Sequence, residues 1–193
     1  MDKAKKRVDT DDRFEIRLSG SGGQGMIFAG MVLAEAVGVN DGKHVVQTQS
    51  YGPEARGGAS RSDVVVSSKE IYYPKPIKLD LLLCLTQEAC DTYHQELKEE
   101  GILVVDSSSV TQLPACEVHA FPFTQLARDR VGTPMVANVI ALGTIAGLTK
   151  IVSKKGLSEV VQRRAPKGTE EKNLKALEIG FELARKKRGK KPH

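Results

Sequence analysis

A glycine-rich segment at residues 18–25, Leu-Ser-Gly-Ser-Gly-Gly-Gln-Gly, constrains the fold of this chain more than any other feature. Residues 14–18 before it alternate apolar and polar side chains, which is typical of a β-strand. After it, apolar residues recur at the spacing of one helix face: Ile27, Met31, Ala34 and Val37. The segment therefore predicts a strand, a glycine turn and a helix, and the N-terminus of that helix favours an anionic group.

The glycine spacing also matches a nucleotide-binding motif in part. Gly20, Gly22 and Gly25 satisfy G-x-G-x-x-G, the dinucleotide fingerprint. A dinucleotide site also carries an acidic residue at the end of the second strand, which holds the ribose. The predicted second strand, residues 44–49, runs into Ser-Tyr-Gly without a carboxylate. Autonomous binding of NAD or FAD is therefore disfavoured, and a plain tight turn is the alternative interpretation of the glycines.

The rest of the chain alternates strand and helix patterns. Residues 79–85 and 102–105 are continuous apolar runs, as in strands that are buried on both faces of a parallel sheet. Shorter strands are predicted at 63–67 and 117–120, and helices at 87–100 (ending at Gly101), 124–130, 135–147, 157–164 and 170–187. This order predicts an α/β fold, a Rossmann-like open, largely parallel sheet with helices on both faces.

The length of 193 residues suits one domain with short appendages. We expect a mobile polar N-terminus at residues 1–12, one domain at 13–187 and a basic tail at 188–193. The last predicted helix carries a narrow apolar stripe: Leu174, Leu177, Phe181 and Ala184. Such a stripe packs on the same domain or on another subunit.

Composition excludes several classes of function. The formal charge of +5 is concentrated in terminal runs, aromatic residues make up 5% of the chain, and tryptophan is absent, so nucleic-acid binding is disfavoured. No apolar run is long enough to span a membrane, and residues 1–7 do not resemble a secretory signal. The three cysteines lack C-x-x-C spacing, which argues against disulfides, structural zinc or an iron–sulfur cluster in this chain. We expect a cytoplasmic protein with reduced thiols.

Ligands of open α/β sheets bind at the carboxyl ends of the strands. Three loops are predicted to meet there, at residues 19–25, 50–61 and 106–109. In the second loop, Arg56 precedes two glycines, which would let a phosphate or another backbone approach its fixed charge. Arg61 adds a second cation, and an ordinary surface arginine is the alternative interpretation of Arg56.

A catalytic constellation is not recognisable. The histidines are scattered and have no metal-ligand spacing: His44, His94, His119 and His193. Asp106 precedes three serines without a G-x-S-x-G elbow, so we expect it to cap a turn or helix. We therefore assign no catalytic residue and no metal site, which suggests a part of a larger assembly.

Three segments together carry a resemblance to a known family. They are Gly-Ser-Gly-Gly-Gln-Gly at 20–25, Gln-Ser-Tyr-Gly-Pro-Glu-Ala-Arg-Gly-Gly at 49–58, and Tyr73-Pro74 before Asp-Leu-Leu at 80–82. Over residues 13–184 the chain resembles the gamma subunit of 2-oxoacid:ferredoxin oxidoreductases, which include the pyruvate, 2-oxoglutarate, 2-oxoisovalerate and indolepyruvate enzymes. The loop at 49–58 is the most discriminating of the three segments.

The resemblance implies oxidative decarboxylation of a 2-oxoacid with coenzyme A to an acyl-CoA, carbon dioxide and reduced ferredoxin. It places thiamine diphosphate, magnesium and the iron–sulfur clusters in partner subunits or other domains. The partners it implies are alpha and beta subunits, with a delta subunit in some complexes, and ferredoxin through the complex. The gamma subunit would close over the thiamine site and assist coenzyme A access without being catalytic alone.

Size and composition favour 2-oxoglutarate or a branched-chain substrate. The cofactor-binding residues that the resemblance implies are Gly20, Gly22, Gly23, Gln24, Gly25, Tyr51, Gly52, Arg56, Gly57 and Gly58. Two other interpretations stay open from the residues alone, a free-standing nucleotide-binding protein and a purely structural interaction subunit.

Overall fold

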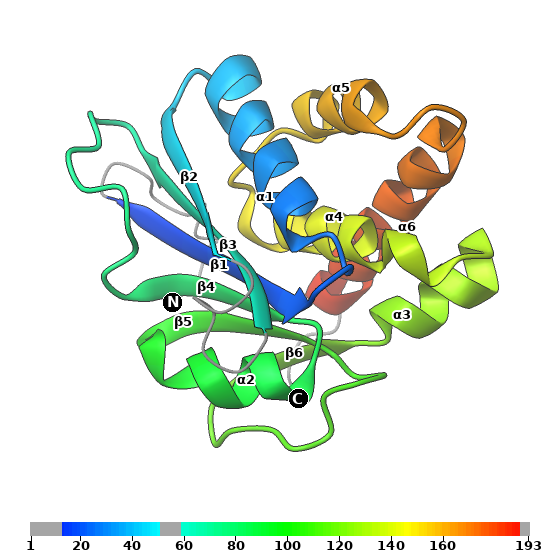
Figure 1. Ribbon diagram of the computed structural model, residues 1–193, viewed down its shortest axis with the longest axis horizontal. Helices are drawn as coiled ribbons and strands as arrows, with labels where there is room; N and C mark the ends of the chain where they lie inside the picture. The colour runs from blue at the N-terminus through cyan, green and yellow to red at the C-terminus, as the bar shows by residue number, and fades with distance from the viewer. Residues whose placement is uncertain (1–12, 51–58, 190–193) are drawn as a thin grey trace.

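The computed structural model describes residues 13–50 and 59–189. A six-stranded sheet in the order β2-β3-β1-β4-β5-β6 forms its centre (Figure 1). The strands are β1 (Phe14–Ser21), β2 (His44–Ser50), β3 (Ala59–Ser67), β4 (Leu79–Cys84), β5 (Leu97–Asp106) and β6 (Val118–Phe121). The α-helices are α1 (Met26–Glu35), α2 (Gln87–Tyr93), α3 (Phe123–Leu126), α4 (Ala137–Thr149), α5 (Lys154–Arg164) and α6 (Glu170–Gly189).

The predicted α/β fold is confirmed, and its sheet has one antiparallel insertion. Strands β1, β4, β5 and β6 pair in parallel, whereas β3 lies antiparallel between β1 and β2. Helix α1 therefore crosses β3 on its way from β1 to β2, and it packs closely there. A Cβ added to Gly30 of α1 would lie 2.0 Å from Ser62 Oγ of β3.

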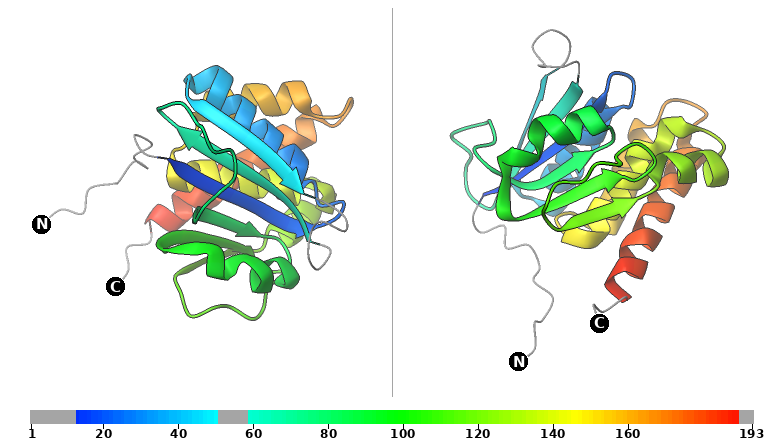
Figure 2. Two further views of the ribbon diagram at one scale, coloured as in Figure 1. Left: turned by 60° about the vertical axis from the view of Figure 1, so that its left-hand side comes forward. Right: turned by 90° about the horizontal axis from the view of Figure 1, so that it is seen from below.

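Helices cover both faces of the sheet, as expected, but unequally (Figure 2). The larger apolar cluster joins one face to α1, α4, α5 and α6. A smaller cluster joins β4 and β5 to α2 on the other face. No helix in the described ranges is long and apolar enough to cross a membrane.

The predicted helix at residues 87–100 is too long. Thr86 caps α2 as expected, since its side chain accepts a hydrogen bond from Ala89 N, but the helix ends at Tyr93. One 3-10 turn follows and β5 begins at Leu97, which pairs with Leu79 of β4. Gly101 lies inside the strand and does not end a helix. Pairing with β4 overrides the local helical pattern, because propensity is weak compared with tertiary contacts.

The apolar face expected for α1 is confirmed in part, since Ala34 and Val37 are buried. Met31 is 37% exposed, whereas Met26, Ala29, Val32 and Leu33 are buried. The buried arc is thus rotated away from Met31. It is also wide, because α1 contacts β3, α4 and α5 together.

Helix α6 packs against α4 of the same domain. Its apolar stripe was expected to pack either on the same domain or on another subunit, and the first alternative holds. Leu177 and Ala184 are buried in this contact. The two backbones meet at glycines, since a Cβ added to Gly180 would lie 2.2 Å from Ile140 O. Close packing of this kind leaves no room for a methyl group.

Candidate functional site

The glycine turn at 19–25 and the two described ends of the 50–61 loop lie at the carboxyl edge of the sheet, where the ligand site was expected. Ser21 at the end of β1 pairs with Ala59 at the start of β3, and Ser50 at the end of β2 pairs with Arg61. The glycine turn and both ends of the 50–61 loop thus lie at one edge. Five expected residues lie outside the described residues: Tyr51, Gly52, Arg56, Gly57 and Gly58.

Two glycines of the turn are required by the chain itself. A Cβ at Gly20 would lie 2.5 Å from Gln24 Oε1, which accepts a hydrogen bond from Ser21 N at 2.8 Å. Gly25 precedes α1 with φ 72°, and a Cβ there would lie 2.4 Å from Asn138 Nδ2 of α4. Asn138 donates to Gly25 O at 3.0 Å. Gly20 and Gly25 therefore shape the turn and dock it on α4.

The other two glycines face open space. Gly22 and Gly23 are both exposed, and a Cβ on either would meet nothing within 4 Å. Gly23 has φ 85°, which explains the glycine there, but Gly22 has no such backbone requirement. The absence of a side chain at Gly22 leaves space for another molecule to approach the backbone.

The turn provides only part of a phosphate site. Helix α1 has no acidic residue in its first turn and no side-chain cap, so its N-terminus favours an anion. However, Ser21 N is taken by Gln24 Oε1, and Gln24 N donates to Ser21 O at 3.3 Å. In a dinucleotide fold the second strand lies beside the first, whereas here β3 separates β2 from β1. This arrangement does not fit a self-sufficient dinucleotide site.

Two cavities border Gly23 on either side of Met135, whose side chain is 68% exposed. The first, about 470 Å³, is lined mainly by apolar groups that include Phe28, Val136 and Pro166. The second, about 210 Å³, contains Arg128. Sequence reasoning missed Met135, because an exposed methionine after a helix-starting proline has no distinctive local pattern.

Asp106 has the expected structural role. It is buried at the end of β5, and its carboxylate accepts hydrogen bonds from Ser108 N at 3.0 Å and Thr124 N at 3.0 Å. The side-chain hydroxyl of Thr124 donates to it as well. The carboxylate thus caps the turn after β5 and the start of α3, as predicted.

The thiols do not form a ligand set. Burial raises the pKa of Cys84, and a hydrogen bond from Cys84 lowers the pKa of Cys90. Both belong to the smaller apolar cluster, whereas Cys116 is exposed. Within residues 13–50 and 59–189, no group of three or more His, Cys, Asp or Glu could hold a metal ion.

Comparison with known proteins gives a consistent result. The family described as pyruvate ferredoxin/flavodoxin oxidoreductase matches residues 15–183. The chain is 49% identical to the 2-oxoglutarate synthase subunit KorC of Methanocaldococcus jannaschii, over 94% of this chain and 98% of that protein.

Solved structures agree. A keto/oxoacid ferredoxin oxidoreductase gamma subunit from Geobacter sulfurreducens is 48% identical, with a TM-score of 0.81 over 90% of this chain and 99% of that one. The same fold, at 24% identity and a TM-score of 0.78, occurs within 2-oxoglutarate:ferredoxin oxidoreductase from Magnetococcus marinus, which was solved with 2-oxoglutarate, coenzyme A and succinyl-CoA bound. This chain matches 31% of that longer chain.

Proposed function

We propose that this chain serves a complex that oxidises 2-oxoglutarate. The chain belongs to the pyruvate ferredoxin/flavodoxin oxidoreductase family and is a gamma subunit of a 2-oxoacid:ferredoxin oxidoreductase. The observation that carries this proposal is the end-to-end identity of 49% with a 2-oxoglutarate synthase subunit. In the proposed reaction, 2-oxoglutarate and coenzyme A yield succinyl-CoA and carbon dioxide, and two electrons pass to ferredoxin.

We assign a supporting role to the domain at residues 13–187. Its carboxyl edge closes over the thiamine site and assists coenzyme A access, with residues 20–25 and Tyr51, Gly52, Arg56, Gly57 and Gly58 as the contact positions. The open space at Gly22 and the two cavities beside Gly23 support this assignment, since both leave room for a second molecule at the turn.

Alpha and beta subunits, with or without a delta subunit, complete the proposed complex in the cytoplasm. They hold thiamine diphosphate, magnesium and the iron–sulfur clusters, and they deliver electrons to ferredoxin. The cysteines of this chain support placing the clusters in the partner subunits. Cys84 and Cys90 are buried in the smaller apolar cluster, whereas Cys116 is exposed. The chain itself contributes shape and backbone groups at the edge of the site.

The substrate proposal is tested by purifying the complete complex and measuring CoA-dependent reduction of a low-potential acceptor. We expect kcat/KM for 2-oxoglutarate to exceed the values for pyruvate and 2-oxoisovalerate by at least about a hundredfold, roughly 2.7 kcal/mol of transition-state discrimination. Equal or better turnover of pyruvate or 2-oxoisovalerate would contradict the proposal.

The role of the turn is tested by Gly22→Ala. A Cβ there is free of contacts within the chain, so we expect unchanged unfolding but a kcat/KM for coenzyme A lowered by at least about tenfold. Gly189→Ala is the matched control, because it also adds a methyl group in open space, at the end of α6. Unchanged kinetics in fully assembled Gly22→Ala complex would remove the turn from the site.

A further inference from the structure

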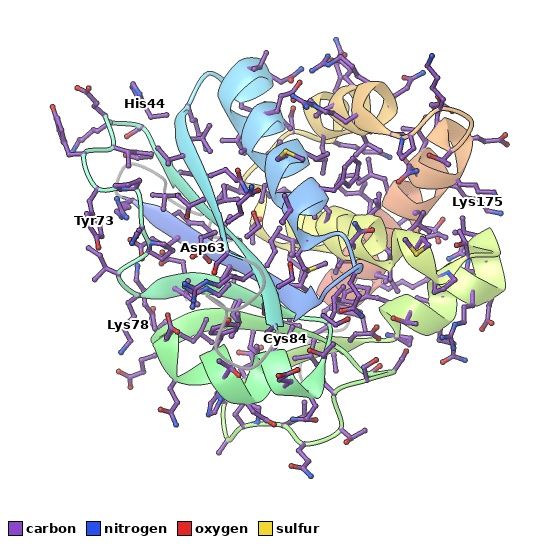
Figure 3. All side chains as sticks on the ribbon, viewed as in Figure 1. His44, Asp63, Tyr73, Lys78, Cys84 and Lys175 are labelled. Atoms are coloured by element: carbon purple, nitrogen blue, oxygen red, sulfur yellow. The ribbon has the colours of Figure 1, made fainter. Side chains whose placement is uncertain are left out.

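A second surface lies at the opposite edge of the sheet, where residues 68–78 connect β3 to β4. Three large side chains of this loop face water, Tyr72 at 87%, Ile77 at 76% and Tyr73 at 54% exposure. Figure 3 shows Tyr73 and Lys78 at the margin of the molecule, on the side away from α6. Clustered exposure of tyrosine and isoleucine is characteristic of protein interfaces.

The loop backbone is fixed by two charged side chains at the start of β1, Arg13 just before the strand and Glu15 within it. Arg13 donates to the carbonyl oxygens of Tyr73 at 2.6 Å and Lys75 at 2.5 Å. Glu15 accepts from Ile77 N at 2.6 Å and pairs with Arg13. Because the backbone is held in place, a partner that binds these apolar side chains does not have to order the loop.

A polar cavity of about 430 Å³ adjoins this loop, on the sheet face that α2 leaves open. Its loop wall consists of Tyr73, Lys75 and Pro76. Across it, Asp63 accepts hydrogen bonds from Arg17 Nε at 2.7 Å and Arg17 Nη2 at 3.1 Å. Both oxygens of Asp63 are therefore engaged by Arg17.

Arg61 at the same cavity is incompletely paired. Its Nε is buried without a hydrogen-bond partner and lies 3.9 Å from Asp63 Oδ2. Its guanidinium carbon is 5.5 Å from the centre of the Tyr93 ring, which holds the side chain in place. The Arg61 side chain is 32% exposed at this cavity, so its positive charge favours an incoming oxyanion.

We propose that the loop at 68–78 and the adjoining cavity form a docking surface for an acidic segment of a partner subunit. A carboxylate of that segment binds Arg61, and its apolar side chains pack on Tyr72 and Ile77. The inference rests on the proposed membership of this chain in a complex. It adds an interface that runs from the loop at 68–78, at the edge opposite the glycine turn, along the cavity to Arg61.

Charge selects this occupant over a second copy of the chain. Residues 68–78 contain exposed Lys69, Lys75 and Lys78 against one acid, Glu70. A two-fold dimer would bring each lysine-rich surface against itself, which is unfavourable. An acidic partner surface removes this repulsion and places a carboxylate beside the partly exposed side chain of Arg61.

The test uses the full chain and the remaining purified subunits of its complex, with Kd measured by calorimetry at 50 and 500 mM salt. We expect Tyr72→Ser/Ile77→Ser to weaken binding at least about a hundredfold, and Arg61→Gln about tenfold with a reduced salt dependence. Leu113→Ser is the control, since Leu113 is 50% exposed outside this surface, and it should bind like the native chain. Circular dichroism verifies that each variant is folded.

Several results would overturn the inference. Native affinity in both Tyr72→Ser/Ile77→Ser and Arg61→Gln would exclude the surface while leaving the proposed function intact. Self-association of the native chain that Tyr72→Ser/Ile77→Ser abolishes would identify a second copy as the occupant. Binding of millimolar inorganic phosphate that Arg61→Gln abolishes, together with native partner affinity in Arg61→Gln, would identify a small-anion site instead. Failure of the native chain to bind the other subunits would overturn the inference and the proposed function together.

Discussion

On one side of β1 the side chains of Phe14, Ile16 and Leu18 join the large apolar cluster beneath α1 and α4, whereas the alternating Glu15 and Arg17 are buried on the other side. The same strand therefore stabilises the fold in two ways. The free energy that apolar contacts contribute changes gradually with the apolar area that is buried. A buried ion depends on particular partners, and the loss of one partner leaves the other charge uncompensated.

Arg17 shows how such an ion is accommodated. Burial lowers the pKa of its guanidinium, but hydrogen bonds and the charges of Asp63 and Glu96 outweigh this effect and the net shift is upward. Its guanidinium carbon lies 4.7 Å from the centre of the Tyr93 ring. The sheet face on the side of α2 thus depends on a small network of Arg17, Asp63 and Glu96. The face beneath α1, α4, α5 and α6, called the helix-covered face below, depends on many interchangeable apolar contacts.

The largest effect is expected for Arg17→Met. The substitution leaves the buried carboxylate of Asp63 without its two hydrogen bonds, and we expect the free energy of unfolding to fall by about 3–5 kcal/mol. Urea denaturation followed by circular dichroism measures the loss. The control is Arg17→Met/Asp63→Leu, which removes both charges and should recover most of the stability. A double variant no more stable than Arg17→Met would show that the network is not the cause.

On the helix-covered face, Gly180→Ala is expected to cost about 2–3 kcal/mol. The added Cβ would meet backbone atoms of α4, Ile140 O at 2.2 Å and Thr144 N at 2.7 Å, so the two helices must separate. The same urea titration on Gly189→Ala provides the control, since that position has no neighbour within 4 Å and should change by less than about 0.5 kcal/mol. Equal stability of the two variants would mean that the helix pair adapts without cost.

The smallest effect concerns an ion pair at the surface of the helical layer. Glu35 of α1 accepts from Arg164 Nε at 2.6 Å and from Arg163, both of α5. The hydrogen bond from Arg163 is the main cause that holds the pKa of Glu35 below 4.5. A lowered folded-state pKa stabilises the protein above 4.5, and this contribution disappears as the pH falls through the folded-state pKa.

For Glu35→Gln we accordingly expect a loss of about 0.5–1 kcal/mol at pH 7. The loss should be smaller at pH 3, because the contribution disappears as the pH falls through the lowered folded-state pKa. Thermal unfolding at both pH values measures the difference, and 0.5 M salt should reduce it at pH 7. A loss that stays constant between pH 7 and pH 3 would rule out the ion pair as its origin.

Much of the fold follows from local pattern. The strands expected at 14–18, 44–49, 79–85 and 102–105 are present, because a run of apolar or alternating residues reports directly which faces of a strand are buried. The glycine turn and the capping role of Asp106 were predictable for the same reason, since their chemistry lies within a few residues. The helix predicted at 87–100 is present only at 87–93, because pairing between Leu97 and Leu79 outweighed the local pattern beyond it.

By itself, the sequence determined the α/β class, the position of the glycine turn and the family. Only the tertiary structure decided that β3 lies between β1 and β2, that Gly20 is required by Gln24 while Gly22 is not, and that Arg61 Nε lacks a hydrogen-bond partner. The physical reason is separation along the chain. Arg17 and Asp63 are 46 residues apart, and no periodicity within either segment encodes which strands become neighbours and which charges meet across them.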